Sequence, residues 1–216
     1  MPAITDVEFR QFSANHHNAQ RNWLLVKLNT DDPAVYGIGD ASPMQDDEQV
    51  KDLIPKFVEK YLRGKDPLES ELHWTTMYQD PQARGGRLAT TAISGIDIAL
   101  WDLKGIATGK PVYELLGGPV SESVQVYASA LHPVGHDKVQ DEARAYVAEG
   151  YRSMKMRFPY GPGDGEKGMD ENEAHIANAR DAVGPDIDLM ADAYMGWNLD
   201  YATKMCKRLE PYGLAW

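Results

Sequence analysis

Hydrophobic residues follow two different rhythms along this chain, and the rhythm changes near residue 120. The first part opens with alternating apolar and polar positions, which are typical of strands with one buried face. The three predicted strands cover residues 3–12, 23–28 and 35–41. Apolar residues then recur every three or four positions over residues 47–64 and 87–109, which predicts two helices.

Between these two helices, Asp66 and Pro67 followed by Glu69 predict another helix start, with an N-cap, a proline in the first turn and a capping-box partner. The helix over 87–109 is apolar on most of its sides. Its main face consists of Ile93, Ile96, Leu100 and Leu103, and Ala92, Ala99 and Ile106 widen that face. A helix this apolar is expected to be buried, here between two domains.

From residue 124 the pattern changes to strand, helix, strand. The predicted strands cover residues 124–130, 151–158 and 186–194, and residues 214–216 read as the opening of another. Strand–helix units that repeat about every 30 residues predict a parallel sheet, in a barrel or in a doubly wound sheet. A closed barrel needs eight such units, so we expect this chain to be the front portion of a larger enzyme.

The chain is acidic, with 22 Lys and Arg against 33 Asp and Glu and a formal net charge of -11. This balance argues against nucleic acid or an anionic membrane as the main partner, but not against a small anion, which meets only the local field. The single cysteine, Cys206, lies in an apolar helical pattern and is expected to be a packing residue. No signal peptide or long apolar run is seen, so we expect a cytoplasmic protein.

Two cations lie on the predicted strand 151–158. Because side chains alternate along a strand, Lys155 and Arg157 are expected on the same face. They could be stray cations on a solvent-facing strand, or they could bind an anion where the strand ends. Arg157 is a poor proton acceptor because its guanidinium stays charged, so Lys155 is the better candidate for carboxylate binding or base chemistry.

An acidic residue lies near the end of the next predicted strand. Asp192 shares a strand face with Asp188, Met190 and Tyr194. It could end the strand by bonding its own backbone, or it could be an oxygen ligand for Mg²⁺. One carboxylate is not a complete metal site, so the other ligands would come from later strands.

Three further features have open interpretations. Gly163, Gly165 and Gly168 match a dinucleotide-binding pattern, but the acidic residues between them would repel a pyrophosphate. His16 lies in a polar loop between the first two strands and could reach a substrate from a covering domain. His132 follows the first repeat strand and lies near the proposed active face.

Two stretches together resemble the mandelate racemase branch of the enolase superfamily. They are "TTAISGIDIALWDLKGIATGKPVYELLGG" and the strand in "GYRSMKMRF". The resemblance implies an α+β capping domain over residues 1–120. It also implies a modified (β/α) TIM-type barrel, of which residues 121–216 supply the first three βα units. Capping loops around residues 13–20 and 37–44 would shape the substrate pocket.

The family's second barrel strand ends in Lys-x-Lys, which corresponds here to Lys155 and Arg157, and its third strand carries the first magnesium-binding carboxylate, here Asp192. The implied chemistry is removal of a proton alpha to a carboxylate, with Mg²⁺ stabilising the enediolate. Arg157 replaces a lysine that serves as a base on one face of the substrate. Racemisation needs bases on both faces, so this replacement disfavours it.

The combination of "MRFPYGP" and "DAYMGW" also resembles acid-sugar dehydratases that act on rhamnonate, lyxonate or galactonate. We therefore expect Mg²⁺-dependent dehydration of a sugar acid, catalysed by Lys155 and Arg157 with help from Tyr160. His16, His132 and Tyr194 are the expected substrate-binding residues, and Tyr194 could share the proton transfer. The main base would be a histidine beyond residue 216, and we expect a homo-oligomer.

Three alternatives remain open from the sequence. One is a racemase or cycloisomerase of the same superfamily. Another is a non-catalytic remnant, if the chain truly ends at Trp216. The third is an NAD-linked oxidoreductase, which would use the glycine-rich segment 163–168.

Overall fold

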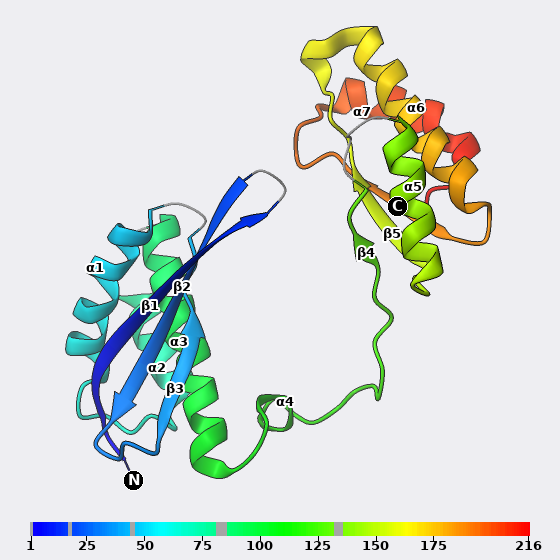
Figure 1. Cartoon of the computed structure of the whole chain (residues 1–216). Coiled ribbons are helices and arrows are strands. Elements are labelled where there is room, and N and C mark those ends of the chain that lie inside the picture. The colour runs from blue at the N-terminus through cyan, green and yellow to red at the C-terminus, as the bar shows by residue number, and fades with distance from the viewer. Residues whose placement is uncertain (1, 17–18, 44–45, 81–85, 132–135) are drawn as a thin grey trace. The chain divides into compact units, whose positions relative to one another are not determined.

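The structure is a computed structural model that describes residues 2–16, 19–43, 46–80, 86–131 and 136–216. Its contacts divide the chain into two compact units, Met1–Val120 and Ser121–Trp216. Each unit has its own hydrophobic core and its own three-stranded sheet (Figure 1).

The first unit opens with an antiparallel sheet in the order β1-β2-β3. Its strands are β1 (Ile4–His16), β2 (Ala19–Thr30) and β3 (Tyr36–Asp40). The first two are longer than predicted, because their backbone ladder continues through polar residues such as the pair Ser13 and Asn22. The Ser13 hydroxyl donates a hydrogen bond of 2.8 Å to the Asn22 side chain, which supports this polar end of the hairpin.

Helices follow the sheet. They are α1 (Asp47–Phe57), which continues in a π-helical turn (Val58–Leu62), α2 (Ser70–Gln79), α3 (Gly86–Thr108) and α4 (Val112–Leu115). The predicted helix start at Asp66 is wrong by about one turn. The Asp66 carboxylate instead accepts the Leu68 amide at 2.9 Å and closes a separate turn, so that α2 begins only at Ser70.

The backbone of helix α3 packs directly against the backbone of β3. A Cβ atom added to Gly37 would lie 1.9 Å from the carbonyl oxygen of Ala99, and one added to Gly39 would lie 2.0 Å from that of Gly95. Only glycine permits such close approach of a helix to a strand. The predicted main face of α3 is buried within this unit, whereas Ile106 and Ile98 are exposed. Burial of this helix between two domains stays a prediction.

The second unit contains the predicted strand–helix repeat. A parallel sheet in the order β4-β5-β6 alternates along the chain with three helices (Figure 1). The elements are β4 (Ala128–Ser129), α5 (His136–Ala148), β5 (Ser153–Arg157), α6 (Gly165–Val183), β6 (Asp188–Asp192) and α7 (Leu199–Leu209). The repeat that the sequence predicted is confirmed. All three strands are shorter than predicted.

The last residues of the chain extend the sheet beyond β6. The Ala215 amide donates to the Leu189 carbonyl at 2.8 Å, and the Ala191 amide donates to the Trp216 carbonyl at 3.0 Å. These are strand-type hydrogen bonds, as expected for the opening of another strand.

Arg180, near the end of α6, fastens the edge of the sheet at which the strands begin. Its guanidinium donates to the carbonyls of Gly184 and Ile187, which precede β6, at 2.8 and 2.7 Å. It also donates to the carbonyls of Tyr212 and Gly213, which precede the final segment, at 2.9 and 3.0 Å. We call this set the Arg180 clamp.

Over the described part of the chain, no helix is both long enough and apolar enough to cross a membrane.

Candidate active site

Lys155, Arg157 and Asp192 come together at the carboxyl ends of β5 and β6. The parallel register places Arg157 beside Asp192. The Lys155 ammonium lies 3.7 Å from Asp192 Oδ2, and the Arg157 Nε atom lies 3.9 Å from the same oxygen. Both distances are those of ion pairs rather than of direct hydrogen bonds, so one carboxylate oxygen faces two cations.

Burial distinguishes the two cations. The side chain of Lys155 is 8% exposed, whereas that of Arg157 is 47% exposed and that of Asp192 is 33% exposed. A lysine this deeply buried needs a partner or a task, because removing its charge from water is costly. The Lys155 side chain is therefore buried at the carboxyl end of the sheet, whereas the Arg157 side chain is partly open to solvent.

The other oxygen of Asp192 has a structural contact. Oδ1 accepts the backbone amide of Tyr194 at 2.7 Å, which is the strand-ending bond that the sequence suggested as an alternative to metal binding. The two interpretations are compatible because they use different oxygens. Oδ1 shapes the loop, and Oδ2 faces the cations.

The loop after β6 has an unusual backbone. Tyr194 and Met195 both have left-handed conformations, with φ of 48° and 60°, which non-glycine residues rarely adopt. The Gly196 amide closes this turn on the Ala193 carbonyl at 2.8 Å. The turn brings the Tyr194 ring to 4.7 Å from the Arg157 guanidinium, in a cation–π contact. Strained backbone of this kind is common at functional sites.

Asp192 fits one position of a magnesium site. Its Oδ2 is a hard oxygen donor, partly exposed and without a direct hydrogen bond in the described structure. Mg²⁺ usually takes one or two protein carboxylates and fills its other positions with water and substrate. Within the described ranges, no three His, Cys, Asp or Glu side chains gather closely enough to hold a metal ion, so Asp192 supplies a partial donor set.

Tyr160, His16 and His132 are the remaining predicted site residues. In the described structure no hydrogen bond or cation–π contact joins the Tyr160 side chain to the charged cluster, and the Tyr160 backbone is held by Asn172 and Trp197. The backbone of His16 ends β1, but its side chain lies outside the described part of the structure, as does the whole of His132. Their proposed roles stay predictions.

Sequence reasoning missed Asn172 and Trp197, which hold the loop that follows Arg157. Asn172 is completely buried and bonds both the backbone amide and the backbone carbonyl of Tyr160, and the Trp197 indole donates to the same carbonyl. A signal for Asn172 was present in the sequence. It is a polar residue within the buried stripe of α6, which otherwise includes Met169 and Ile176.

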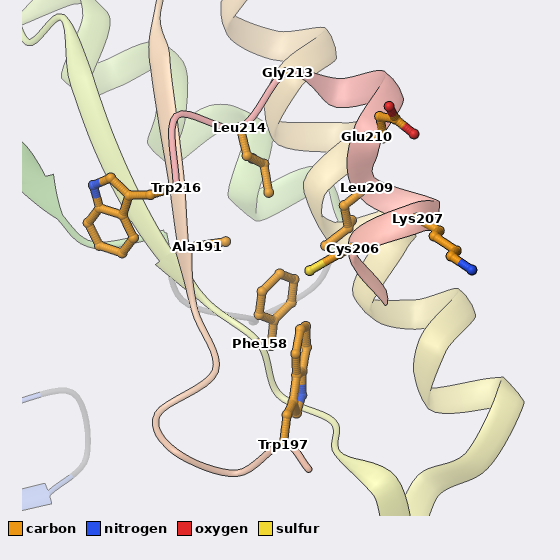
Figure 2. A pocket seen from close by; sticks show the side chains of 10 residues that line it. All are labelled: Phe158, Ala191, Trp197, Cys206, Lys207, Leu209, Glu210, Gly213, Leu214 and Trp216. Atoms are coloured by element: carbon orange, nitrogen blue, oxygen red, sulfur yellow. The ribbon is translucent and has the colours of Figure 1, made fainter. Parts of the chain in front are cut away.

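A hollow of about 550 Å³ is lined by Ala191 of β6 and by Cys206 and Leu209 of α7 (Figure 2). Ala191 lies on the strand face opposite to that of Asp192. Apolar side chains supply most of its wall, and Phe158 and Trp197 lie side by side along it. Cys206 also lines it and is exposed, so the prediction that this thiol is a packing residue is wrong. None of the charged site residues borders this hollow, so it is separate from the candidate chemistry.

The glycine-rich segment does not form an open cradle for a pyrophosphate. The Asp164 carboxylate accepts the Gly161 amide at 2.9 Å, so an acidic side chain already occupies this turn. A Cβ atom on Gly168 would lie 2.5 Å from the Asp164 Cβ, which shows that this glycine serves close packing.

Known proteins resemble this chain in sequence. A candidate L-rhamnonate dehydratase of Caldivirga maquilingensis is 37% identical over 165 residues, which are 76% of this chain and 39% of that protein. A D-galactonate dehydratase family member of Paenibacillus sp. (strain JDR-2) is 33% identical over 218 residues, covering 89% of this chain and 52% of that protein. The chain thus spans about half the length, or less, of these relatives.

Solved structures resemble it in fold. The 3,6-anhydro-D-galactonate cycloisomerase from Zobellia galactanivorans has a TM-score of 0.85 and 29% identity, covering 99% of this chain and 57% of that one. An enolase from Pantoea ananatis with bound D-gluconate and Mg has a TM-score of 0.85 and 28% identity, covering 99% of this chain and 59% of that one.

Two family models match the two units. The mandelate racemase / muconate lactonizing enzyme N-terminal domain matches residues 6–117, and the enolase C-terminal domain-like model matches residues 138–216. The chain belongs to the mandelate racemase / muconate lactonizing enzyme family of the enolase superfamily, with an α+β capping domain followed by the first part of a (β/α) barrel.

Proposed function

We propose that this protein is a hydro-lyase that dehydrates a sugar acid to a 2-keto-3-deoxy acid, with Mg²⁺ as its cofactor. The observation that carries the proposal is the meeting of Lys155, Arg157 and Asp192 at the carboxyl ends of two parallel strands. In (β/α) barrels this edge is where substrates bind. The two cations Lys155 and Arg157 suit an anionic substrate, and the carboxylate of Asp192 suits the Mg²⁺ that this substrate would also contact.

In the proposed reaction a base removes the proton alpha to the substrate carboxylate, and the electron pair of that bond forms an enolic double bond. The hydroxyl on the next carbon then leaves, takes a proton from an acid and becomes water. The resulting enol tautomerises to the 2-keto acid. Charge develops on the carboxylate during the first step, so fixed positive groups there lower the barrier.

The chain's own residues fit distinct roles. Lys155, buried beside Asp192, would bind a substrate carboxylate oxygen or take part in proton transfer. Arg157 would stabilise negative charge, because its planar guanidinium is held between Asp192 and the Tyr194 ring and cannot act as a base. Mg²⁺ held by Asp192 would supply Lewis acidity where the negative charge develops.

The names of similar proteins support an aldonic acid as the substrate. They refer to L-rhamnonate, to D-galactonate and to a bound D-gluconate with Mg. All three are polyhydroxylated carboxylates, with an acidic alpha carbon and a hydroxyl on the next carbon. A cytoplasmic homo-oligomer is the form in which we propose that the enzyme acts.

A second candidate is a cycloisomerase, because one similar structure carries the name 3,6-anhydro-D-galactonate cycloisomerase. Such a reaction also begins beside a carboxylate, but it rearranges the substrate without forming a dehydration product from an aldonate.

The experiment is to incubate the full-length protein with L-rhamnonate, D-galactonate and D-gluconate, with and without Mg²⁺, in D₂O. Formation of a 2-keto-3-deoxy acid that requires Mg²⁺ supports the dehydratase. Exchange of the alpha proton without keto acid favours the isomerase, and the absence of both with all three acids contradicts the proposal.

Lys155→Met and Arg157→Lys should each lower turnover at least tenfold, whereas Arg144→Lys, on the exposed side of α5, should not.

A further inference from the structure

The backbone of Tyr160 is held by side chains from two different elements of the second unit. Its N–H and C=O belong to two consecutive peptide groups, and we call these two groups together the Tyr160 peptide. Its amide donates to Asn172 Oδ1 at 3.2 Å, and its carbonyl accepts from Asn172 Nδ2 at 3.0 Å. Asn172 belongs to α6. The same carbonyl also accepts from the Trp197 indole at 2.9 Å, and Trp197 lies in the loop between β6 and α7.

The Asn172 side chain has no spare hydrogen-bonding capacity to lose without cost. It is completely buried, and its Nδ2 atom also donates to the Tyr201 hydroxyl at 3.2 Å. Burial raises the pKa of the Tyr201 phenol, so this hydroxyl stays neutral. The Asn172 amide thus uses both N–H groups and its carbonyl oxygen, and a buried network of this kind favours one arrangement of the groups that it joins.

Packing reinforces the same arrangement. The Trp197 ring lies 4.4 Å from the Phe158 ring and 5.3 Å from the Tyr201 ring, between centroids. On the α6 side, a Cβ atom on Gly168 would lie 3.1 Å from the Tyr160 Cβ, so the loop rests directly on the helix. The Tyr160 peptide is therefore fixed from both sides.

This peptide connects the two loops that carry the candidate site. Tyr160 is three residues after Arg157, and Trp197 is three residues after Tyr194. Between these anchors, Arg157 contacts the Tyr194 ring and Asp192. A shift of either loop would change these contacts, because their distances depend on the spacing between the ends of β5 and β6.

We infer that Asn172 and Trp197 are positioning residues that hold the loops after β5 and β6 together through the Tyr160 peptide, and so fix Arg157 against Tyr194 and Asp192. The two residues bond the backbone of Tyr160, and in the described structure they form no hydrogen bond with Lys155, Arg157 or Asp192. Their effect on turnover rests on the proposed function, whereas their effect on the coupling of the two loops does not.

The test uses the full-length protein and four variants. Asn172→Leu removes both bonds to the Tyr160 peptide, and Trp197→Phe removes the indole donor while keeping an aromatic ring. Matched controls are Asn178→Leu, whose side chain on the same helix bonds Gln140 of α5, and Trp74→Phe, which lies in the first unit. Amide hydrogen exchange is measured for residues 158–163 and 193–198, together with kcat and KM.

Asn172→Leu and Trp197→Phe are each expected to speed exchange about tenfold in both loops, because each variant removes a hydrogen bond to the Tyr160 peptide that the two loops share. Trp197→Phe should thus affect residues 158–163 as well as its own loop. The control variants should change neither loop. With a sugar acid that turns over, kcat should fall about tenfold and KM much less, because positioning acts mainly in the transition state.

The inference is overturned if Asn172→Leu speeds exchange only in residues 158–163 and Trp197→Phe only in residues 193–198. It is equally overturned if both variants keep the parent kcat on an active substrate. If Asn172→Leu does not fold, Trp197→Phe alone decides by its effect on residues 158–163. If no sugar acid is turned over, the exchange result still decides this inference, and only the proposed function fails.

Discussion

Asp192 combines two tasks that could have been assigned to separate residues. One oxygen holds the Tyr194 amide and thus the strained turn, and the other faces Lys155 and Arg157. The negative charge is needed only for the second task, since an uncharged amide oxygen can also accept a backbone hydrogen bond.

Substituting Asp192→Asn should therefore separate the two tasks. We expect the affinity for Mg²⁺, measured by calorimetric titration, to fall at least tenfold, because a carboxylate ligand is lost. The Tyr194 amide should keep its protection from hydrogen exchange. Asp188→Asn, at the opposite end of β6, is the control and should bind Mg²⁺ like the parent. Unchanged Mg²⁺ affinity in Asp192→Asn would remove Asp192 from the metal site.

A second residue-scale prediction concerns Asp97 of α3. Burial raises the pKa of the Asp97 carboxyl, so its ionised form is less favourable in the folded chain than in the unfolded chain. The full destabilisation is present above the pKa of Asp97 in the folded chain, and it fades as the pH falls through that value. It disappears below the pKa of Asp97 in the unfolded chain, which is about 4.

Asp97→Asn removes the charge and should raise the thermal midpoint by about 2 °C at neutral pH, with the gain vanishing under acidic conditions. Thermal scans from about pH 3 to pH 7 would measure it. The exposed Asp52→Asn, on α1, should show no such trend. A gain that grows as the pH falls would contradict the assigned cause.

At the scale of elements, the sequence predicted what depends on periodicity and missed what depends on contact. Strands β5 and β6 and the helices after them follow from apolar spacing, and the shared face of Lys155 and Arg157 follows from alternation. Asn172 was missed because its partner is a backbone peptide 12 residues away, which no periodicity encodes. The left-handed turn after β6 was missed because its two left-handed residues, Tyr194 and Met195, are not glycines.

The contact between β3 and α3 offers a test at this scale. A methyl group at Gly39 would lie 2.0 Å from the Gly95 carbonyl oxygen, and backbone cannot give way as a flexible side chain can. We expect Gly39→Ala to lower the free energy of unfolding by about 3 kcal/mol, measured in urea. Gly163→Ala, where a methyl group meets nothing within 4 Å, should change it by less than about 0.5 kcal/mol. Equal stability of the two variants would refute the close packing.

At the scale of the whole molecule, the two units have separate cores. One consists mainly of α3 and the β1–β3 sheet, with Leu100 fully buried, and the other surrounds Met156 of β5. Since each core is built from residues of its own unit, local stability in one should respond weakly to a cavity in the other.

Leu100→Ala should therefore cost about 2–5 kcal/mol in the first unit and speed amide exchange in β2, β3 and α1, while β5 and β6 keep their protection. Met156→Ala is the reciprocal variant and should have the opposite distribution. Hydrogen exchange followed by mass spectrometry gives both maps. If Leu100→Ala loosened β5 as much as β3, the two cores would have to unfold as one.

The Arg180 clamp has a consequence for how this fold can change over time. It fixes the edge at which the strands begin, with four backbone carbonyls that exist whatever the side chains are. The proposed chemistry lies at the opposite edge, on the loops after β5 and β6. Mutations can therefore accumulate in those loops, and new substrate preferences can be selected there, without each step endangering the sheet. For an engineer, Arg180 is a residue to leave alone, and the solvent-facing positions after Asp192, such as Met195, are where a library should begin.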